Sequence, residues 1–578
     1  MLILLLREHL RPYRRLLWAV VTLQFGSTLA ALYLPTLNAD LIDNGIVRGD
    51  TEHIMRVGAV MLAFTAIQVV AAIAAVYVGA QVAMAVGRDL RAGVFGRVQN
   101  FSGEEIARFG APSLITRTTN DAGQIQAFLL LGFTMAVPAP VSAIGGIALA
   151  LHQDVPLSSV LLVVLPVLVL SVAVLIRAMR PLFREMQTGI DSVNRILREQ
   201  ITGVRVIRAF VRDEHESDRF TRANAELREV SLGTGRLLAM MFPIVLFVVN
   251  AASVSVLWFG GHRIDDGGMQ LGALTAFLSY LMQILFAVMM ATFTLSQMPR
   301  AEVCAERITE VLGTEATVVV PTDGVTSMPT PGALELRSVD FRFPGAEQAV
   351  LHGVDLSAVR GGVTAIVGGT GSGKSTLCTL IPRLVDPSAG EVLVGGVNIR
   401  ELDPAALARA VGYVPQRPFL FSGTVATNLA FGRPDASEDE MWAALTTAQA
   451  ADFVRAMPEG LHSPIAQGGS NVSGGQRQRL AIARALIARP DLYVFDDAFS
   501  ALDNATDAAL RAALVPWTAG ATVLIVAQRV GTIRHADRIV VLDGGAVVGT
   551  GTHDELMAGC GCYTEIVLSQ LSAEEAAR

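Results

Sequence analysis

Six long runs of apolar residues dominate the chain between residues 16 and 300. A helix that crosses a bilayer needs about 20 mostly apolar residues, and each run is long enough. The runs carry almost no ionisable side chain, whereas the helices of a large soluble core would show polar faces. We therefore expect membrane-spanning helices at residues 16–37, 57–86, 124–152, 156–179, 236–260 and 272–298.

The overall composition agrees with a membrane protein that also carries a soluble region. Hydrophobic residues make up 52% of the chain and charged residues only 17%, which is unusual for a soluble protein. The charge shortage is confined to the first 300 residues, and the remainder is typical of a soluble α/β domain. A net charge of −7 argues against nucleic acid as a partner, because nucleic-acid binding favours a basic face.

Arginine placement predicts the orientation of the six spans. Arginines are frequent before the first span, between the second and third, and after the fourth, whereas the other three connections are poor in arginine. Positively charged loops stay on the cytoplasmic side of a membrane. We expect a multi-pass protein of the plasma (inner) membrane, with both termini, two long loops and the region after residue 300 in the cytoplasm.

The only lysine of the chain, Lys374, lies in a glycine-rich segment between a predicted buried strand, Val363–Val367, and a predicted helix that starts at Thr376. This context is typical of a phosphate-binding loop, in which backbone N–H groups surround phosphates and a compact ammonium reaches between them. A planar guanidinium does not replace that ammonium. The loop residues are Gly368, Gly369, Thr370, Gly371, Ser372, Gly373, Lys374, Ser375 and Thr376.

Two further elements follow in the order expected of an ATPase. The aliphatic segment Leu492–Phe495 predicts a strand that ends in Asp496, and Asp496 together with the Ser375 hydroxyl is placed to hold Mg²⁺. Residues Val472–Gln476 open a predicted helix about 20 residues upstream of that strand, and a helix N-terminus suits a phosphate anion. We therefore expect ATP and Mg²⁺ as cofactors.

These motifs resemble those of the ATP-binding cassette (ABC) family. The resemblance implies that Val472–Gln476 is the family signature, which binds the ATP held by a partner subunit. It further implies that Phe343 stacks on adenine and that Gln416 is the Q-loop glutamine, a third Mg²⁺ ligand beside Ser375 and Asp496. The signature residues are Ser473, Gly474, Gly475 and Gln476, and the implied D-loop residues are Ser500, Ala501, Leu502 and Asp503.

The membrane half also resembles ABC exporters. The segments that carry this resemblance are Leu34–Leu37, Leu41–Gly45, Ser113–Arg117, Gly203–Phe210 and Ala301–Ile308. The implied fold class is a polytopic α-helical membrane domain followed by an α/β P-loop cassette. We place the membrane domain with two cytoplasmic coupling loops at 1–313, a Thr/Pro/Gly-rich linker at 314–333 and the cassette at 334–578.

Two residues depart from the pattern of active family members. Asp497 stands where the family has a glutamate base, and its side chain is one methylene shorter, about 1.5 Å less reach toward the attacking water. Gln528 stands where the family has a histidine, and it cannot carry positive charge toward the γ-phosphate. Both changes weaken one chemical step. A third departure, at Gln467–Gly469, has no effect that we can assign.

The intact signature beside a weak catalytic base predicts the degenerate-site subunit of a heterodimer with a second half-transporter. The chain would be an ABC-type translocase in which ATP hydrolysis occurs mainly at the partner's consensus site. The signature of this chain would complete that site. The chain's own ATP would stay bound longer.

The expected function is ATP-driven export of small hydrophobic or amphipathic compounds (drug, lipid or peptide) from the bilayer. The polar residues of the spans are few and uncharged, and several methionines could line an adaptable cavity or only pack against lipid. These residues are Gln24, Gln68, Asn250, Gln283, Met240, Met241, Met282, Met289 and Met290. Two alternatives remain open: an exporter-fold importer of metal-chelate ligands, and a regulatory ATP-binding subunit.

Overall fold

The computed structural model describes residues 1–527 and 529–570, which form two compact units. The first unit holds Met1–Arg97 and Pro112–Gly313. The second holds Val98–Ala111 and the chain from Thr314 onward. The segment Val98–Ala111 lies inside the region that the sequence assigned to the membrane domain, yet it packs with the second unit.

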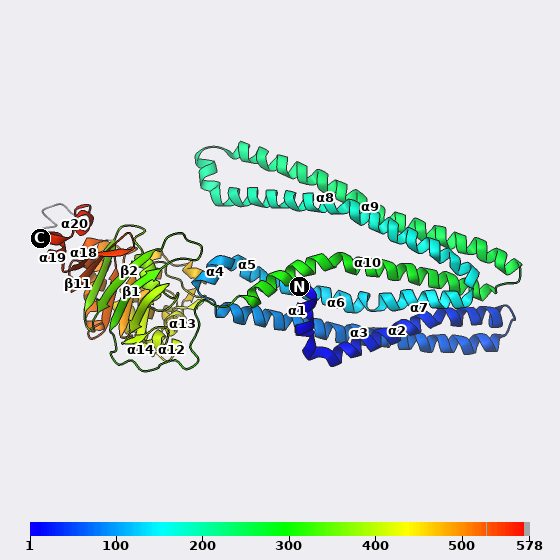
Figure 1. The fold of residues 1–578 in the computed structure, drawn as a ribbon, viewed down its shortest axis with the longest axis horizontal. Coiled ribbons are helices and arrows are strands. Elements are labelled where there is room, and N and C mark those ends of the chain that lie inside the picture. Colours follow the sequence, from blue (N-terminus) through cyan, green and yellow to red (C-terminus); the bar gives the residue numbers. More distant parts are fainter. Residues whose placement is uncertain (528, 571–578) are drawn as a thin grey trace. The chain divides into compact units, whose positions relative to one another are not determined.

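The first unit is helical throughout (Figure 1). Six continuous helical stretches are long and apolar enough to cross a membrane, which confirms the predicted six-helix architecture. The helices extend well beyond the apolar runs: the fourth stretch covers Val155–Ala209, whereas the apolar run ends at 179. The helices are α1 (Leu2–Leu10), η1 (Arg11–Tyr13), α2 (Arg14–Asp40), η2 (Leu41–Ile46), α3 (Thr51–Gln99), α5 (Ala111–Thr116), η3 (Arg117–Asp121), α6 (Ala122–Leu131), η4 (Gly132–Ala136), α7 (Pro138–Gln153), α8 (Val155–Ala209), α9 (Asp213–Asp265) and α10 (Leu271–Gly313).

Helix α10 packs against α2, α6 and α7, and α8 packs along α9 to form a long hairpin (Figure 1). Phe277, Tyr280 and Ile284 of α10 are fully buried in this packing. Close approach to α7 depends on glycine: a Cβ at Gly146 would lie only 2.8 Å from Cγ1 of Ile284. Small residues at helix contacts are a common device of membrane proteins, because they let backbones approach.

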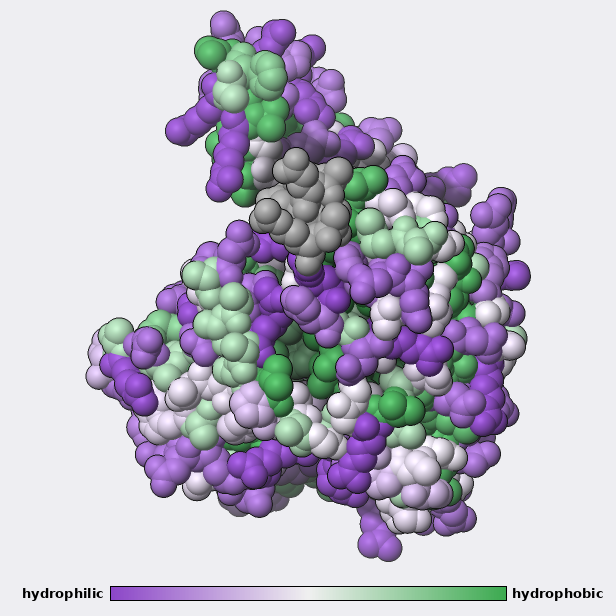
Figure 2. All heavy atoms as spheres, turned by 90° about the vertical axis from the view of Figure 1, so that its left-hand side faces the viewer, coloured by the Kyte–Doolittle hydropathy of each residue, from purple (hydrophilic) through white to green (hydrophobic). Residues whose placement is uncertain are grey.

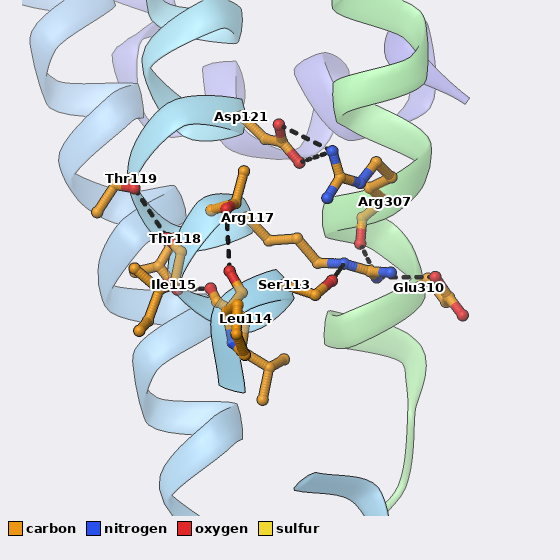
Figure 3. A network of polar contacts seen from close by, with 11 residues as sticks. Ser113, Leu114, Ile115, Arg117, Thr118, Thr119, Asp121, Arg307 and Glu310 are labelled. Atoms are coloured by element: carbon orange, nitrogen blue, oxygen red, sulfur yellow. Dashed lines mark hydrogen bonds and ion pairs between the residues drawn. The ribbon is translucent and has the colours of Figure 1, made fainter. Parts of the chain in front are cut away.

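A partly buried ionic network joins α10 to the π-helical segment η3 (Figure 3). Arg117 donates to the carbonyl of Arg307 and pairs with Glu310, both at 2.7 Å. Arg307 in turn pairs with the buried carboxylate of Asp121 at 3.2 Å. The network therefore fixes the last part of α10 against the helix that follows the segment Val98–Ala111.

The second unit is an α/β domain with two main sheets and a two-stranded ribbon. The larger sheet has the order β12-β11-β3-β10-β9-β6, in which all strands but β12 run parallel. The smaller antiparallel sheet has the order β2-β1-β4-β5. The strands are β1 (Leu334–Phe341), β2 (Leu351–Ala358), β3 (Val363–Gly368), β4 (Ala389–Val394), β5 (Val397–Asn398), β6 (Val411–Val414), β7 (Gly423–Thr424), β8 (Pro464–Ile465), β9 (Leu492–Asp496), β10 (Thr522–Val526), β11 (Arg538–Asp543) and β12 (Ala546–Gly551).

Two hydrophobic cores cover the two faces of the larger sheet. Ile366 of β3 packs into the core shared with the smaller sheet, whereas its neighbours Ala365 and Val367 pack on the opposite, helix-covered face. This alternation follows from the two-residue period of a strand. One outer face of the unit is covered mainly by hydrophilic side chains (Figure 2). The helices are α4 (Gly103–Phe109), α11 (Lys374–Leu380), α12 (Pro404–Ala410), α13 (Val425–Ala430), α14 (Glu438–Thr447), α15 (Ala451–Arg455), η5 (Gly460–His462), η6 (Gln467–Gly469), α16 (Gly474–Ile487), α17 (Asn504–Trp517), α18 (Val530–Ile533), α19 (His553–Gly559) and α20 (Gly561–Leu568).

The segment 314–333, which the sequence suggests is a linker, is hydrogen-bonded to the second unit along its length. Thr317 donates its N–H to the buried carboxylate of Glu105 on α4 at 3.1 Å. Val325 donates its N–H to the carbonyl of Glu401 at 2.8 Å, and Thr330 donates to the carbonyl of Gly395 at 3.0 Å. The segment is therefore bound to the domain along its length and is not a free linker.

Candidate nucleotide site

The phosphate loop lies between β3 and α11, in the strand–loop–helix order that the sequence predicts, but α11 begins at Lys374 and not at Thr376. Gly371 and Gly373 adopt φ angles of +84° and +93°, which favour glycine. A Cβ at Gly373 would also lie 2.6 Å from Cδ2 of Leu351. A Cβ at Gly369 would meet no atom within 4 Å, so the outer side of the loop is open to a ligand.

Lys374 lies inside the curve of this loop. Its Nζ donates to the carbonyl oxygens of Gly368 and Gly369 at 2.9 and 2.6 Å and to Oγ of Ser372 at 3.2 Å. Burial lowers the pKa of Lys374, and the nearby carboxylates of Asp496 and Asp497 oppose that shift. The loop thus holds a desolvated cation, and desolvated cations attract phosphate oxygens strongly.

The predicted magnesium ligands Ser375 and Asp496 lie next to each other. Oγ of Ser375 donates to Oδ1 of Asp496 at 2.9 Å, and Asp496 is 3% exposed at the end of β9. Burial raises the pKa of Asp496, while the Ser375 hydrogen bond opposes the shift. A hydroxyl oxygen and a carboxylate oxygen are the hard ligands that Mg²⁺ prefers, so the residues present fit the ion.

Tyr413 belongs to this site although the sequence does not single it out. It lies on β6, which pairs in parallel with β9. Its side chain lies close enough to Asp496 for the charge of that carboxylate to act on it: burial, followed by the charge of Asp496, raises the pKa of Tyr413. The only sequence signal is an aromatic hydroxyl in a short apolar segment just before Gln416.

Asp497 and Gln416 are in direct contact. Nε2 of Gln416 donates to Oδ2 of Asp497 at 3.1 Å, and the N–H of Asp497 donates to the carbonyl of Val526 at 3.0 Å. Asp497 has φ +48°, in the left-handed region that costs a non-glycine residue energy. Its carboxylate is thus held on a strained backbone close to Asp496. The other departure from the family pattern, Gln528, lies outside the described residues.

Phe343 follows β1 and is about half exposed, at 48%. Its ring packs edge-on against Phe341, with ring centroids 4.9 Å apart and an interplanar angle of 88°. The edge-on contact leaves ring surface exposed to a flat ligand, and aromatic faces suit the base of a nucleotide.

The signature forms the first turn of α16. Ser473 caps this helix by accepting a bond from the N–H of Gln476 at 3.2 Å, and the side chain of Gln476 accepts from the N–H of Ser473 at 2.8 Å. A Cβ at Gly474 would meet no atom within 4 Å, so this end of the helix is open. A Cβ at Gly475 would lie 3.3 Å from the carbonyl of Ala501, which places the signature against the D-loop.

The D-loop, Ser500–Asp503, links the base position to α17. Ser500 donates its hydroxyl to the carbonyl of Asp497 at 2.8 Å. Asp503 caps α17 by accepting from the N–H of Thr506 at 2.9 Å, and this bond, with that from the Thr506 hydroxyl, lowers the pKa of Asp503. Leu502 is buried between them. The N–H of Ser500 also donates to the carbonyl of Asp497 at 3.3 Å, so movement of the D-loop would change the position of Asp497 through these two hydrogen bonds.

The predicted substrate-facing residues of the spans separate into different environments. Gln24 is buried and donates to the carbonyl of Phe133 at 3.0 Å, so it serves helix packing. Gln68, Gln283 and Met290 line one cavity. The remaining candidates do not line that cavity, and they are Met240, Met241, Asn250, Met282 and Met289.

Six helices able to cross a membrane and a phosphate-loop domain with a serine–aspartate pair define a membrane-bound ATPase of the P-loop class. The family model for the ABC transporter transmembrane region matches residues 17–288, and the model for the ABC transporter ATPase domain matches residues 351–500. The chain belongs to the ABC transporter family.

Several relatives cover almost the whole chain. An uncharacterized ABC transporter ATP-binding protein of Mycobacterium tuberculosis is 52% identical, and the match covers 99% of this chain and 98% of the relative. The uncharacterized protein YfiB of Bacillus subtilis is 36% identical over 98% of both chains. An ATP-dependent lipid A-core flippase of Chromobacterium violaceum is 32% identical over 98% of both chains.

The fold is that of an ABC exporter. A solved bacterial Atm1-family ABC exporter with ATP bound matches with a TM-score of 0.79 at 23% identity, covering 98% of this chain and 99% of that one. One membrane region is followed by one ATPase domain, so the chain is an exporter-type half-transporter.

Proposed function

We propose that this chain is the degenerate-site subunit of an ATP-driven exporter that pairs with a second half-transporter. It binds ATP and Mg²⁺ but hydrolyses ATP poorly at its own site, and its signature completes the partner's site. The observation that carries the proposal is the short carboxylate of Asp497 at the base position, bonded to Gln416 at 3.1 Å.

The residues of the phosphate loop fit the role of ATP binding. Lys374 would exchange its bonds to the loop carbonyls for bonds to phosphate oxygens, and Phe343 offers its exposed ring to adenine. Ser375, Asp496 and Gln416 would hold Mg²⁺, which neutralises phosphate charge when it is bound. Asp496 is already oriented for this role by its hydrogen bond from Ser375.

Poor hydrolysis follows from the reach and the partner of Asp497. A general base must come within hydrogen-bond distance of the attacking water, and aspartate is one methylene shorter than glutamate. The hydrogen bond from Gln416 occupies Oδ2 of this carboxylate and holds the side chain toward Gln416. Gln528 would add to this effect, since glutamine carries no positive charge toward the transition state.

Pairing with a second half-transporter is supported by the signature. Ser473 and the amides of the first turn of α16 form an open, capped helix N-terminus, which is suited to the phosphates of an ATP bound elsewhere. An intact signature beside a weak base is useful where the other chain supplies the competent base. Export then follows from alternation between paired and separated ATPase domains.

The direction of transport and the orientation belong to the same proposal. Arginine-rich connections support the cytoplasmic side for the ATPase domain. Related proteins include an ATP-dependent lipid A-core flippase and a putative multidrug export protein of Bacillus subtilis, which is 29% identical. We accordingly propose outward movement of hydrophobic or amphipathic compounds.

Inverted membrane vesicles that contain the chain with its partner test the function. A fluorescent amphipathic probe is added outside with ATP, and its accumulation in the lumen is followed. Export predicts ATP-dependent uptake. Movement out of preloaded vesicles would favour an importer instead, and normal ATP binding with no movement in either direction would favour a regulatory subunit.

A further inference from the structure

A cavity of about 580 Å³ lies among α2, α3, α7 and α10 of the first unit. We propose that it binds a neutral ligand that combines an apolar body with hydrogen-bonding hydroxyl or amide groups. It thereby selects against substrates that carry a formal charge in the bound portion. The inference rests on the proposed export function, whose substrate class it narrows.

Three unpaired carboxamides converge on this cavity from three helices. They belong to Asn38 of α2, Gln68 of α3 and Gln283 of α10. Each residue is partly exposed, and among the described residues none of the three side chains has a hydrogen-bond partner. Gln24, outside the cavity, shows the contrasting case of a buried carboxamide used for packing, since it donates to Phe133.

Unpaired amides are costly inside a bilayer, so their convergence points to a ligand or to water. Gln283 lies roughly 18 Å along α10 from its first residue, well inside a hydrocarbon layer about 30 Å thick. Polar side chains at such depth face a bundle interior or a pathway rather than lipid. Ser142 and Ser279 add hydroxyl groups to the same wall.

The lining carries no ionisable side chain among the described residues. Two acidic residues that follow Asn38 in the chain have partners outside the cavity. Asp40 pairs with His53 at 3.1 Å, and Asp43 accepts from the N–H of Gly272 at 2.6 Å. A charged group in the cavity would therefore lose its water without gaining a counter-charge, which is strongly unfavourable.

The rest of the wall is apolar and adaptable. Leu34, Phe286, Met61 and Met290 contribute branched, aromatic and flexible thioether surface. The volume lies in the range of pockets that hold small organic ligands. The combination of this surface with donors and acceptors that carry no charge defines the ligand class.

Three probes that share one N-alkyl dansylamide body and differ at the chain end test this inference. They end in a hydroxyl, a quaternary ammonium or a carboxylate group. Binding is measured by fluorescence titration of the full chain in lipid nanodiscs, corrected with empty discs. We expect the hydroxyl probe to bind at least about tenfold more tightly than either charged probe. Equal or tighter binding of a charged probe would overturn the inference.

Substitutions test whether the carboxamides are responsible. Gln68→Leu and Gln283→Leu should each weaken binding of the hydroxyl probe by roughly three- to tenfold, as expected for a lost neutral hydrogen bond. Thr65→Val, on α3 outside the cavity, should leave binding unchanged. Gln283→Glu should reverse the order of probe affinities and favour the quaternary ammonium probe. If Gln283 served only helix packing, this substitution would not change that order. Unchanged binding in both leucine variants, with a normal elution profile, would count against the proposal.

ATP-driven uptake of the same probes separates this inference from the export function. Selective binding of the hydroxyl probe without ATP-driven uptake would support the cavity chemistry and contradict export. Uptake of all three probes at the same rate would support export and overturn the neutral-ligand inference.

Discussion

At the scale of single residues, the proposed function predicts that the length of the Asp497 side chain limits hydrolysis at this ATP site. Lengthening it by one methylene in Asp497→Glu should raise ATP hydrolysis at this site by about tenfold or more, because a base within reach contributes at least that much. The measurement is single-turnover hydrolysis of radiolabelled ATP by the complex. The exposed Asp452→Glu, which adds the same methylene far from the site, should have no effect. No gain in the Asp497 variant would show that reach is not the limiting factor.

Lys374 gives a second residue-scale prediction. Its Nζ fits among the carbonyls of Gly368 and Gly369, where a planar guanidinium would not. Lys374→Arg should therefore weaken binding of a fluorescent ATP analogue by more than about tenfold although the charge is kept. An unchanged circular dichroism spectrum would show that the fold is intact. Wild-type affinity in this variant would contradict the assigned role.

The sequence predicted most residues of the site because they lie in contiguous motifs. Lys374, Ser375 and Asp496 come from local strand–loop–helix patterns, and the structure places them together. Tyr413 could not be found this way. Its contact with Asp496 depends on β6 lying next to β9 in the sheet, and sheet order is a property of the whole domain.

At the scale of elements, the partly buried ion pair between η3 and α10 has a structural role that can be measured. Asp121→Asn leaves Arg307 without its counter-charge. Breaking a fully buried pair costs about 3–5 kcal/mol, and we expect a smaller loss here because Arg307 is 37% exposed and partly screened by solvent. We expect a clear fall in the unfolding temperature of the purified chain. The exposed pair Arg56–Glu52 provides the control, since Glu52→Gln should change stability by less than about 1 kcal/mol. Equal, small effects of both variants would contradict a stabilising role for the network.

The elements themselves were only partly predictable. Apolar runs located the six membrane helices, since period and length are local properties. The ends of the six helices could not be located from the apolar runs, because helices such as α8 continue through polar residues beyond the run. Likewise, the segment 314–333 has the composition of a flexible linker, but its backbone hydrogen bonds to Glu401 and Gly395 form only in the folded domain.

At the scale of the whole molecule, we propose that the chain holds two halves of different sites. In this proposal the phosphate loop, the Ser375–Asp496 pair and Asp497 form a nucleotide site with slow hydrolysis, whereas Ser473 and the start of α16 serve another chain's ATP. Each motif is continuous in the sequence, so the motifs can be recognised there, and the division of labour between them stays a prediction.

The most direct test of this account is the steady-state ATPase rate of the chain alone and of its complex with the partner, with two single substitutions. We predict little turnover by the chain alone and high turnover by the complex. Ser473→Ala should reduce that turnover strongly, because it alters the signature at the partner's site, whereas Asp497→Asn should leave most of it. Robust turnover by the chain alone, or loss of turnover in Asp497→Asn but not in Ser473→Ala, would contradict the account.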